Sequence, residues 1–165
     1  MAGKKAAAPK EGAPHVKIIA RNRRATFDYY VEERLECGVA LRGTEVKSLR
    51  EHSAQLSDAY AVGQHGELML LNAQIPQYGP AGPLGNHEPK RTRKLLLHRR
   101  ELDRLAGRAQ ERGLTLVPTR VYFSGSHAKV EIALGRGKDL YDKRQSIRER
   151  ETKRDMERAV REARR

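Results

Sequence analysis

Three clusters of basic residues are the side chains of this sequence best suited to binding chemistry. One cluster surrounds Asn22, a second precedes a leucine-rich run, and the third lies near the end of the apolar region; their members are Arg21, Arg23, Arg24, Arg91, Arg93, Lys94, Arg120 and Lys129. A guanidinium group donates paired hydrogen bonds and stays charged, which suits it to phosphate. One such cluster is typical of any solvated surface, but three on a small chain favour an RNA-binding surface.

Catalytic and metal sites find little support in the sequence. The six histidines show no HxH or HExxH spacing, and neither GxSxG nor a Walker loop occurs. The adjacent carboxylates of Glu32 and Glu33 fall on an expected strand, where they would point to opposite faces. Cys37 lies between Leu35 and Val39, a position more typical of a buried core thiol than of a nucleophile. We therefore expect no enzymatic activity, no cofactor and no metal site.

Composition and net charge limit the kinds of molecule that this protein is expected to bind. The chain has 165 residues and a net charge of +13, from 34 Lys and Arg against 21 Asp and Glu. This length fits one domain of roughly 100–200 residues, and the excess charge points to a polyanion. No run approaches the ~18 apolar residues of a membrane span, and the basic termini lack the bulky apolar residues that a membrane surface requires. A single cysteine fits a reducing, cytoplasmic compartment.

The charge and apolar residues divide the chain into three parts. Residues 1–17 mix Ala, Lys, Gly and Pro and predict a disordered basic arm, whereas residues 18–135 carry the apolar pattern of a folded core. Residues 136–165 hold twelve basic and seven acidic residues and form a basic tail. Acid-to-base pairs four residues apart in this tail favour a helix. Its apolar stripe is thin, so we expect disorder in solution and a helix on binding.

The pattern of the core predicts mainly strands, which follow one another as hairpins. Short alternating runs predict strands at 27–31 and 35–41, a hairpin over 58–75, and a second hairpin from 114–123 and 127–134. Helical spacing predicts a short helix at 43–50 and a longer one from about Leu95 to a stop at Gly113. A Pro- and Gly-rich loop spans 76–90. Consecutive hairpins favour an antiparallel sheet or small barrel of about six strands.

Three segments together resemble the bacterial SsrA-binding protein family, also called small protein B. They are IARNRRATFDYYVEERLECGVALRGTEVKSLR (19–50), RTRKLLLHRREL (91–102) and GKDLYDKR (137–144), within a resemblance that covers about 19–150. The resemblance implies a six-stranded antiparallel barrel of the oligonucleotide-binding (OB) type with short flanking helices. It also implies a monomer that binds the tRNA-like domain of transfer-messenger RNA. Such a protein delivers this RNA to stalled ribosomes for trans-translation.

The same resemblance assigns roles to individual residues. It implies RNA contacts at Asn22, Glu36, Leu96 and Lys129. It further implies that the tail becomes helical on the ribosome and lies in the empty mRNA channel of the small subunit. The residues implied to contact the decoding centre are Tyr141, Asp142, Lys143 and Arg144, and Lys138 is implied as a further ribosome-contacting residue of the tail.

Two other functions remain open at this point. A generic single-stranded RNA-binding or ribosome-associated barrel protein would carry the same charge without a dedicated RNA partner. It would lose little affinity when Asn22, Glu36 or Lys129 is replaced singly, because diffuse charge is redundant. An RNA-processing nuclease would need a constellation of carboxylates or histidines, and no such spacing is visible.

Overall fold

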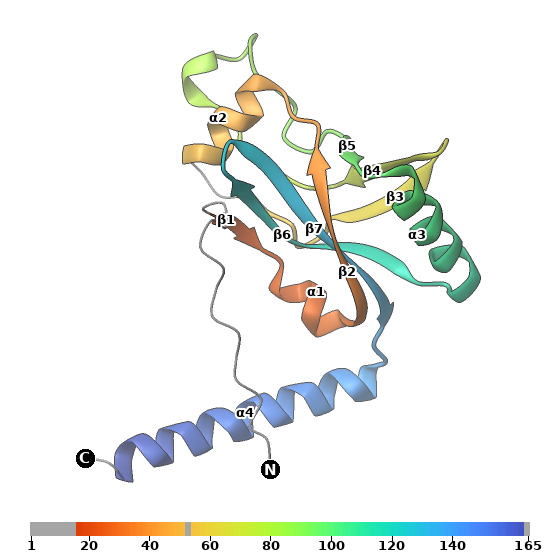
Figure 1. The fold of residues 1–165 in the computed structure, drawn as a ribbon. Coiled ribbons are helices and arrows are strands. Elements are labelled where there is room, and N and C mark those ends of the chain that lie inside the picture. Colours follow the sequence, from red (N-terminus) through yellow and green to blue (C-terminus); the bar gives the residue numbers. More distant parts are fainter. Residues whose placement is uncertain (1–15, 52–53, 164–165) are drawn as a thin grey trace, which may run out of the picture.

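Antiparallel strands dominate the fold, and within the described residues four α-helices lie around them (Figure 1). We describe it from a computed structural model, which places residues 16–51 and 54–163. Within these residues the elements are β1 (Val16–Arg21), α1 (Arg23–Asp28), β2 (Tyr29–Val39), α2 (Gly43–Glu51), β3 (Tyr60–Gln64), β4 (Glu67–Leu71), the 3-10 turn η1 (Gly79–Ala81), β5 (Arg93–Leu96), α3 (Arg99–Arg112), β6 (Thr115–Ser124), β7 (His127–Gly137) and α4 (Leu140–Ala163).

Six of the strands pair in a ring, in the order β6-β3-β4-β5-β2-β7 and back to β6. The junction between β3 and β6 consists of one residue pair, Ala61 with Leu116. β1 is added outside this ring, along the half of β6 that ends at Ser124. The mainly antiparallel β fold with flanking helices agrees with the sequence prediction, and β1 makes a seventh strand in the described residues.

Several element boundaries differ from those that the sequence predicts. Val16 and Lys17, assigned to the arm, are the first residues of β1, while residues 1–15 lie outside the described part. Phe27 belongs to α1 and not to a strand, because a buried cap at Asn22 begins that short helix. Leu95 and Leu96 form β5, since every second side chain from Arg93 to Leu96 is buried.

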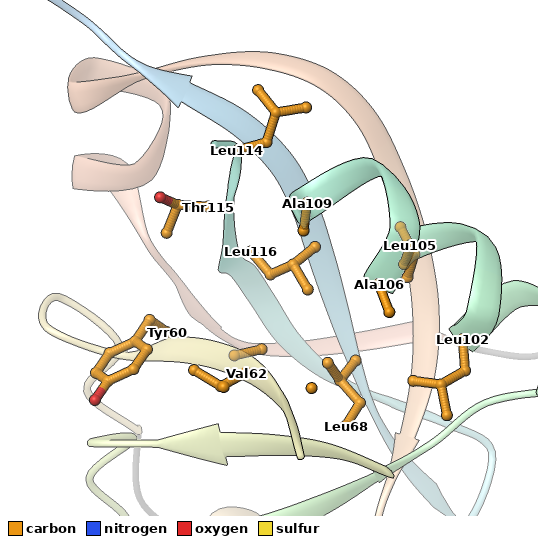
Figure 2. A pocket seen from close by; sticks show the side chains of 12 residues that line it. Tyr60, Val62, Leu68, Leu102, Leu105, Ala106, Ala109, Leu114, Thr115 and Leu116 are labelled. Atoms are coloured by element: carbon orange, nitrogen blue, oxygen red, sulfur yellow. The ribbon is translucent and has the colours of Figure 1, made fainter. Parts of the chain in front are cut away.

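Helix α3 begins after His98 and ends at Gly113, as its C-terminal glycine predicts. Gly113 has φ +59, in the left-handed region that favours glycine at a helix end. The helix packs Leu102 and Leu105 against the sheet, where they join the main apolar cluster. A partly open apolar pocket of about 340 Å³ remains between α3, β3 and β6 (Figure 2). Its lining is mostly Leu, Ala and Val and carries no charged side chain, so it offers little to a charged ligand.

A bulge in β2 changes where its two adjacent carboxylates point. The register of β2 against β7 shifts between Val31 and Glu33. As a result Glu32 and Glu33 both bind Arg108 on α3, instead of pointing to opposite faces. These carboxylates therefore hold α3 to the sheet.

Helix α4 lies beyond the end of β7, at the opposite end of the molecule from α2 (Figure 1). Helix α4 spans both predicted acid-to-base pairs, Glu149 with Lys153 and Glu157 with Arg161. The structure therefore contains the helix that the acid-to-base spacing favours, and its formation only on binding stays a prediction. None of the helices in the described residues is long and apolar enough to cross a membrane.

Candidate nucleic-acid interface

Strand register brings distant residues into two neighbouring rows on the side of the sheet away from the main apolar cluster, where Tyr122 and Glu131 are themselves buried. The first row crosses β1, β6, β7, β2 and β5 and consists of Ile18, Tyr122, Lys129, Gly38 and Leu96. The second row crosses β1, β6, β7 and β2 and consists of Arg21, Arg120, Glu131 and Glu36. Residues between the rows, such as Cys37 and Val130, are buried in the core. We call the surface formed by the two rows the strand face.

A three-residue cluster joins the two rows. The carboxylate of Glu36 accepts hydrogen bonds from the Tyr122 hydroxyl at one oxygen and from Lys129 Nζ at the other. These two donors hold the pKa of Glu36 below its usual value. Burial, with Glu36 beside it, raises the pKa of Tyr122, so its hydroxyl stays protonated and donates. Glu36 and Lys129, implied by the resemblance as separate RNA contacts, are thus one ion pair.

Leu96 stands beside this cluster as an exposed apolar side chain. Half of its surface is accessible, and a Cβ at the facing Gly38 would lie 3.2 Å from Leu96 Cβ. Gly38 therefore leaves room for Leu96 to lie flat across β2, next to Lys129. An exposed leucine beside an ion pair can pack on a nucleobase while the charges meet the sugar and phosphate.

Arginines gather at the other end of the strand face. Arg21 and Arg120 are cross-strand neighbours, and Arg120 Nη2 lies 2.7 Å from the nearly buried carboxylate of Glu131. Arg120 also lies over the Tyr122 ring, with 5.1 Å between the guanidinium carbon and the ring centre. Arg23 is exposed on α1 close by. The predicted basic residues Arg21 and Arg23 therefore lie on the surface.

Asn22 occupies a structural position. Its side-chain oxygen accepts from the backbone N–H groups of Arg24 and Ala25, both at 3.1 Å. Its amide nitrogen donates to the carbonyl oxygens of Leu56 at 2.8 Å and Pro118 at 3.0 Å. Since all four interactions are internal and the residue is 7% exposed, Asn22 fixes the junction of β1 and α1. Its effect on RNA is expected to act through the exposed arginines beside it.

The structure corrects the expectation for Arg93. Its guanidinium is fully buried and bound to Glu45 Oε1 at 2.8 Å and to the carbonyl oxygen of Pro89 at 2.9 Å, so it cannot reach a ligand on the surface. Arg91 binds the same carboxylate at 2.6 Å and keeps about a fifth of its side chain exposed. Together they tie α2 to β5 and to the 76–90 loop.

Two further predicted residues are exposed and already paired. Lys94 on β5 forms an ion pair with Glu67 of β4. Arg24 on α1 lies 3.1 Å from Asp58 and 3.6 Å from Asp28. Both lie apart from the Glu36 cluster, and both would need to exchange a carboxylate for a phosphate to bind RNA.

The tail residues begin where the sheet ends. The backbone N–H of Lys138 donates to the carbonyl oxygen of Asp28 at 2.8 Å, and the Lys138 ammonium lies 4.8 Å from the Tyr30 ring centre. Tyr141 is 78% exposed, and Arg144 is exposed on α4, while Asp142 is half-buried. Partial burial and the Asp142 carboxylate raise the pKa of Tyr30. The side chain of Lys143 lies outside the described part, although its backbone belongs to α4.

Sequence reasoning missed Tyr122 and Glu131 as members of the strand face, and Arg34 and Thr119 as side chains that contact Glu131. The available signal was the hairpin turn at 124–126, whose register sets Tyr122 opposite Lys129 and Arg120 opposite Glu131. No cluster of three or more metal-ligating side chains occurs among the residues that the structure describes. The strand face thus combines cations, one exposed leucine and carboxylates that orient the cations.

Comparison with known proteins identifies a family. A family model described as "SmpB protein" matches residues 19–162. The SsrA-binding protein of Trichodesmium erythraeum is 50% identical over 153 residues, which cover 93% of this chain and 98% of that protein. The SsrA-binding protein of Myxococcus xanthus is 53% identical over 148 residues, covering 90% and 91% respectively. A solved structure described as "tmRNA-SmpB: a journey to the center of the bacterial ribosome" is similar with a TM-score of 0.62 and 47% identity, covering 73% of this chain and 85% of that chain.

Proposed function

The chain belongs to the SmpB protein family, and we propose on that basis that it binds transfer-messenger RNA and brings it to stalled ribosomes for trans-translation. In this role the strand face holds the tRNA-like domain of the RNA. The protein acts by binding, without a catalytic step or a cofactor, in the cytoplasm where ribosomes work. The observation that carries the proposal is the family match over residues 19–162.

The strand face supports RNA as the ligand on chemical grounds. Lys129, Arg120 and Arg21 provide positive charge for phosphates. Leu96 offers an apolar surface for a base, and the Glu36 carboxylate can accept from a 2′-hydroxyl or a base edge. A surface built only for non-specific phosphate contact would not keep a carboxylate at its centre.

Recovery of the native RNA tests the proposal directly. Full-length protein is purified from bacterial cells under native conditions, and the RNA that comes with it is sequenced. We expect one strongly enriched species with a tRNA-like end. A Glu36→Ala variant should lose this enrichment, while Glu67→Ala, an equal charge change outside the strand face, should keep it. A broad mixture of RNAs with the wild-type protein would overturn the proposal in favour of a generic RNA-binding protein.

The C-terminal tail has a separate function in this proposal. α4 follows the end of β7, at the opposite end of the molecule from α2 (Figure 1), and its exposed Tyr141 can stack on a base of the decoding centre. Deleting residues 140–165 keeps Lys138 and its contact with Asp28. The truncated protein should retain its affinity for the RNA and lose the tagging of stalled peptides. A large loss of affinity would place the tail in the primary RNA site instead.

A further inference from the structure

A pocket of about 330 Å³ lies beside the Glu36 cluster, at the end of the strand face formed by β1, β6 and β7 and next to α1. Four arginines line it, from four different elements: Arg21 of β1, Arg23 of α1, Arg34 of β2 and Arg120 of β6. We call it the arginine pocket. Four guanidinium groups brought together repel one another and destabilise the fold, unless a negative charge is present or a ligand supplies one.

The internal counter-charge of the arginine pocket is the carboxylate of Glu131, which is 8% exposed. Its Oε1 accepts from the Thr119 hydroxyl at 2.6 Å and lies 3.8 Å from Arg34 Nη1. Its Oε2 accepts from Arg120, with Nε at 3.0 Å and Nη2 at 2.7 Å. The Glu131 carboxylate thus pairs with Arg34 and Arg120, while Arg21 and Arg23 line the same pocket, which leaves an excess of positive charge around it.

These contacts also fix where Arg120 points. One edge of the Arg120 guanidinium donates to Glu131, and the guanidinium lies over the Tyr122 ring. The Arg34 and Arg120 side chains remain 54% and 39% exposed, so both retain donors that face solvent. Because Glu131 pre-orients Arg120, that side chain loses little freedom on binding, which favours a compact anion with several acceptor oxygens.

We propose that the arginine pocket binds a phosphate of the RNA backbone, that Arg34 and Arg120 contact it, and that Glu131 is a positioning residue for Arg120. The proposal rests on the proposed function, because it takes RNA as the ligand. It extends that function to a site in which Arg34, Arg120 and Glu131 act together. Because Glu131 and Glu36 are cross-strand neighbours, a strand of RNA that meets Glu36 and Lys129 reaches this pocket with an adjacent part of its backbone.

The test measures affinity of the full-length protein for the tRNA-like domain of transfer-messenger RNA at several salt concentrations. The variants are Arg34→Ala and Arg120→Ala, and the control is Arg100→Ala, which removes the same charge from an exposed position on α3 outside this pocket. Loss of a charge-assisted contact should weaken binding roughly tenfold or more. Each lost phosphate contact should also reduce the slope of log K against log salt by about 0.7–0.9. Arg100→Ala should change both quantities much less.

Two further variants separate positioning from long-range charge. Arg120→Lys keeps the charge and removes the planar fork, so a bidentate phosphate contact predicts weaker binding. Glu131→Gln keeps the size of the side chain and raises the net positive charge, so electrostatics alone predicts tighter binding and a positioning role predicts weaker binding. Thermal unfolding of each variant identifies any loss that comes from the fold, and Arg34→Ala tests the pocket independently because Arg34 is exposed.

The outcomes distinguish this inference from the function on which it rests. If Arg34→Ala and Arg120→Ala change the affinity and the salt slope only as much as Arg100→Ala does, the pocket does not bind phosphate. Tighter binding by Glu131→Gln removes the positioning role. If wild-type protein shows no preference for the tRNA-like domain over an unrelated RNA of equal length, the proposed function fails. The salt slopes measured on either RNA still decide whether the pocket binds phosphate.

Discussion

The amide nitrogen of Asn22 donates to the carbonyl oxygen of Leu56 at 2.8 Å, although the two residues are 34 positions apart. The same side chain caps α1 through Arg24 and Ala25. Alanine at this position removes a helix cap, worth about 0.5–2 kcal/mol, and leaves buried carbonyl oxygens without a donor, at about 1–3 kcal/mol. We therefore expect Asn22→Ala to lower the free energy of unfolding by about 2–4 kcal/mol, measured in urea.

A matched control is Gln145→Ala, which removes an exposed side-chain amide from α4. Its effect on unfolding should be within about 0.5 kcal/mol, as for most surface substitutions. Asn22 would have to be reassigned as a direct RNA contact if its alanine variant unfolded like wild type and still lost RNA affinity.

Glu45 and Arg93 form an ion pair that is almost completely buried. The exposed fraction of the side chain is 0% for Glu45 and 1% for Arg93. Burial alone would raise the pKa of Glu45, but hydrogen bonds from Arg91, the backbone N–H of Arg42 and Arg93 outweigh it and hold the pKa below its usual value of 4.5. Glu45→Gln leaves the buried Arg93 charge without its partner. The expected cost at pH 7 is about 3–5 kcal/mol of unfolding free energy.

The pH dependence of this pair follows from the lowered pKa of Glu45. The folded state favours the ionised carboxylate, so the stabilisation is complete above pH 4.5 and is lost as the pH falls through the lower pKa of the folded state. Wild-type protein should therefore lose stability below about pH 4.5 more steeply than Glu45→Gln does.

Glu67→Gln, which breaks the exposed pair with Lys94, should cost at most about 1 kcal/mol of unfolding free energy. Equal losses in the two variants would show that the buried pair is not the stronger one.

Cys37 should be unreactive in the native protein. Its side chain is fully buried, and burial, with Glu101 and Glu36 near it, raises the pKa of the thiol to about 12. Because the thiolate is the reactive form, an aromatic disulfide reagent at pH 8 should label native protein only as fast as it unfolds. In guanidinium chloride the single thiol should react at once. Rapid labelling of native protein would mean that β2 opens at this point.

The hairpins and the end of α3 could be predicted from the sequence because their signals are local. The β3–β4 and β6–β7 turns use glycines with positive φ, Gly66 and Gly125, next to alternating apolar residues. Gly113 stops α3 for the same backbone reason. α1 could not be predicted, because its start depends on contacts of Asn22 with Leu56 and Pro118 far along the chain.

The strand face was only partly predictable for a comparable reason. The family resemblance supplied Glu36, Leu96 and Lys129, but their proximity depends on the register of β2 against β5 and β7. Arg93 looks like its exposed neighbours in the sequence, and its burial depends on Glu45, 48 positions away. A charge run is usually a solvated surface, so only the structure reveals which arginine belongs to the core.

The hydroxyl of Tyr122 offers the most specific test of the Glu36 cluster. It donates to one oxygen of Glu36 while Lys129 binds the other, so the carboxylate has a fixed orientation. Tyr122→Phe removes this donor and keeps both the ring under Arg120 and the net charge. RNA affinity should fall several-fold, by the roughly 0.5–1.5 kcal/mol of one hydrogen bond, while the salt slope should not change, because no phosphate contact is lost.

Glu36→Ala completes the argument, because it raises the net positive charge and yet should weaken RNA binding. The carboxylate both orients Lys129 and supplies an acceptor, and its lowered pKa keeps it ionised through neutral pH. The affinity loss should therefore be the same at pH 6 and pH 8, measured at one salt concentration. The double variant with Tyr122→Phe should lose little more than Glu36→Ala alone, since both remove one shared interaction. Tighter binding by Glu36→Ala would instead mean that charge alone governs the interaction.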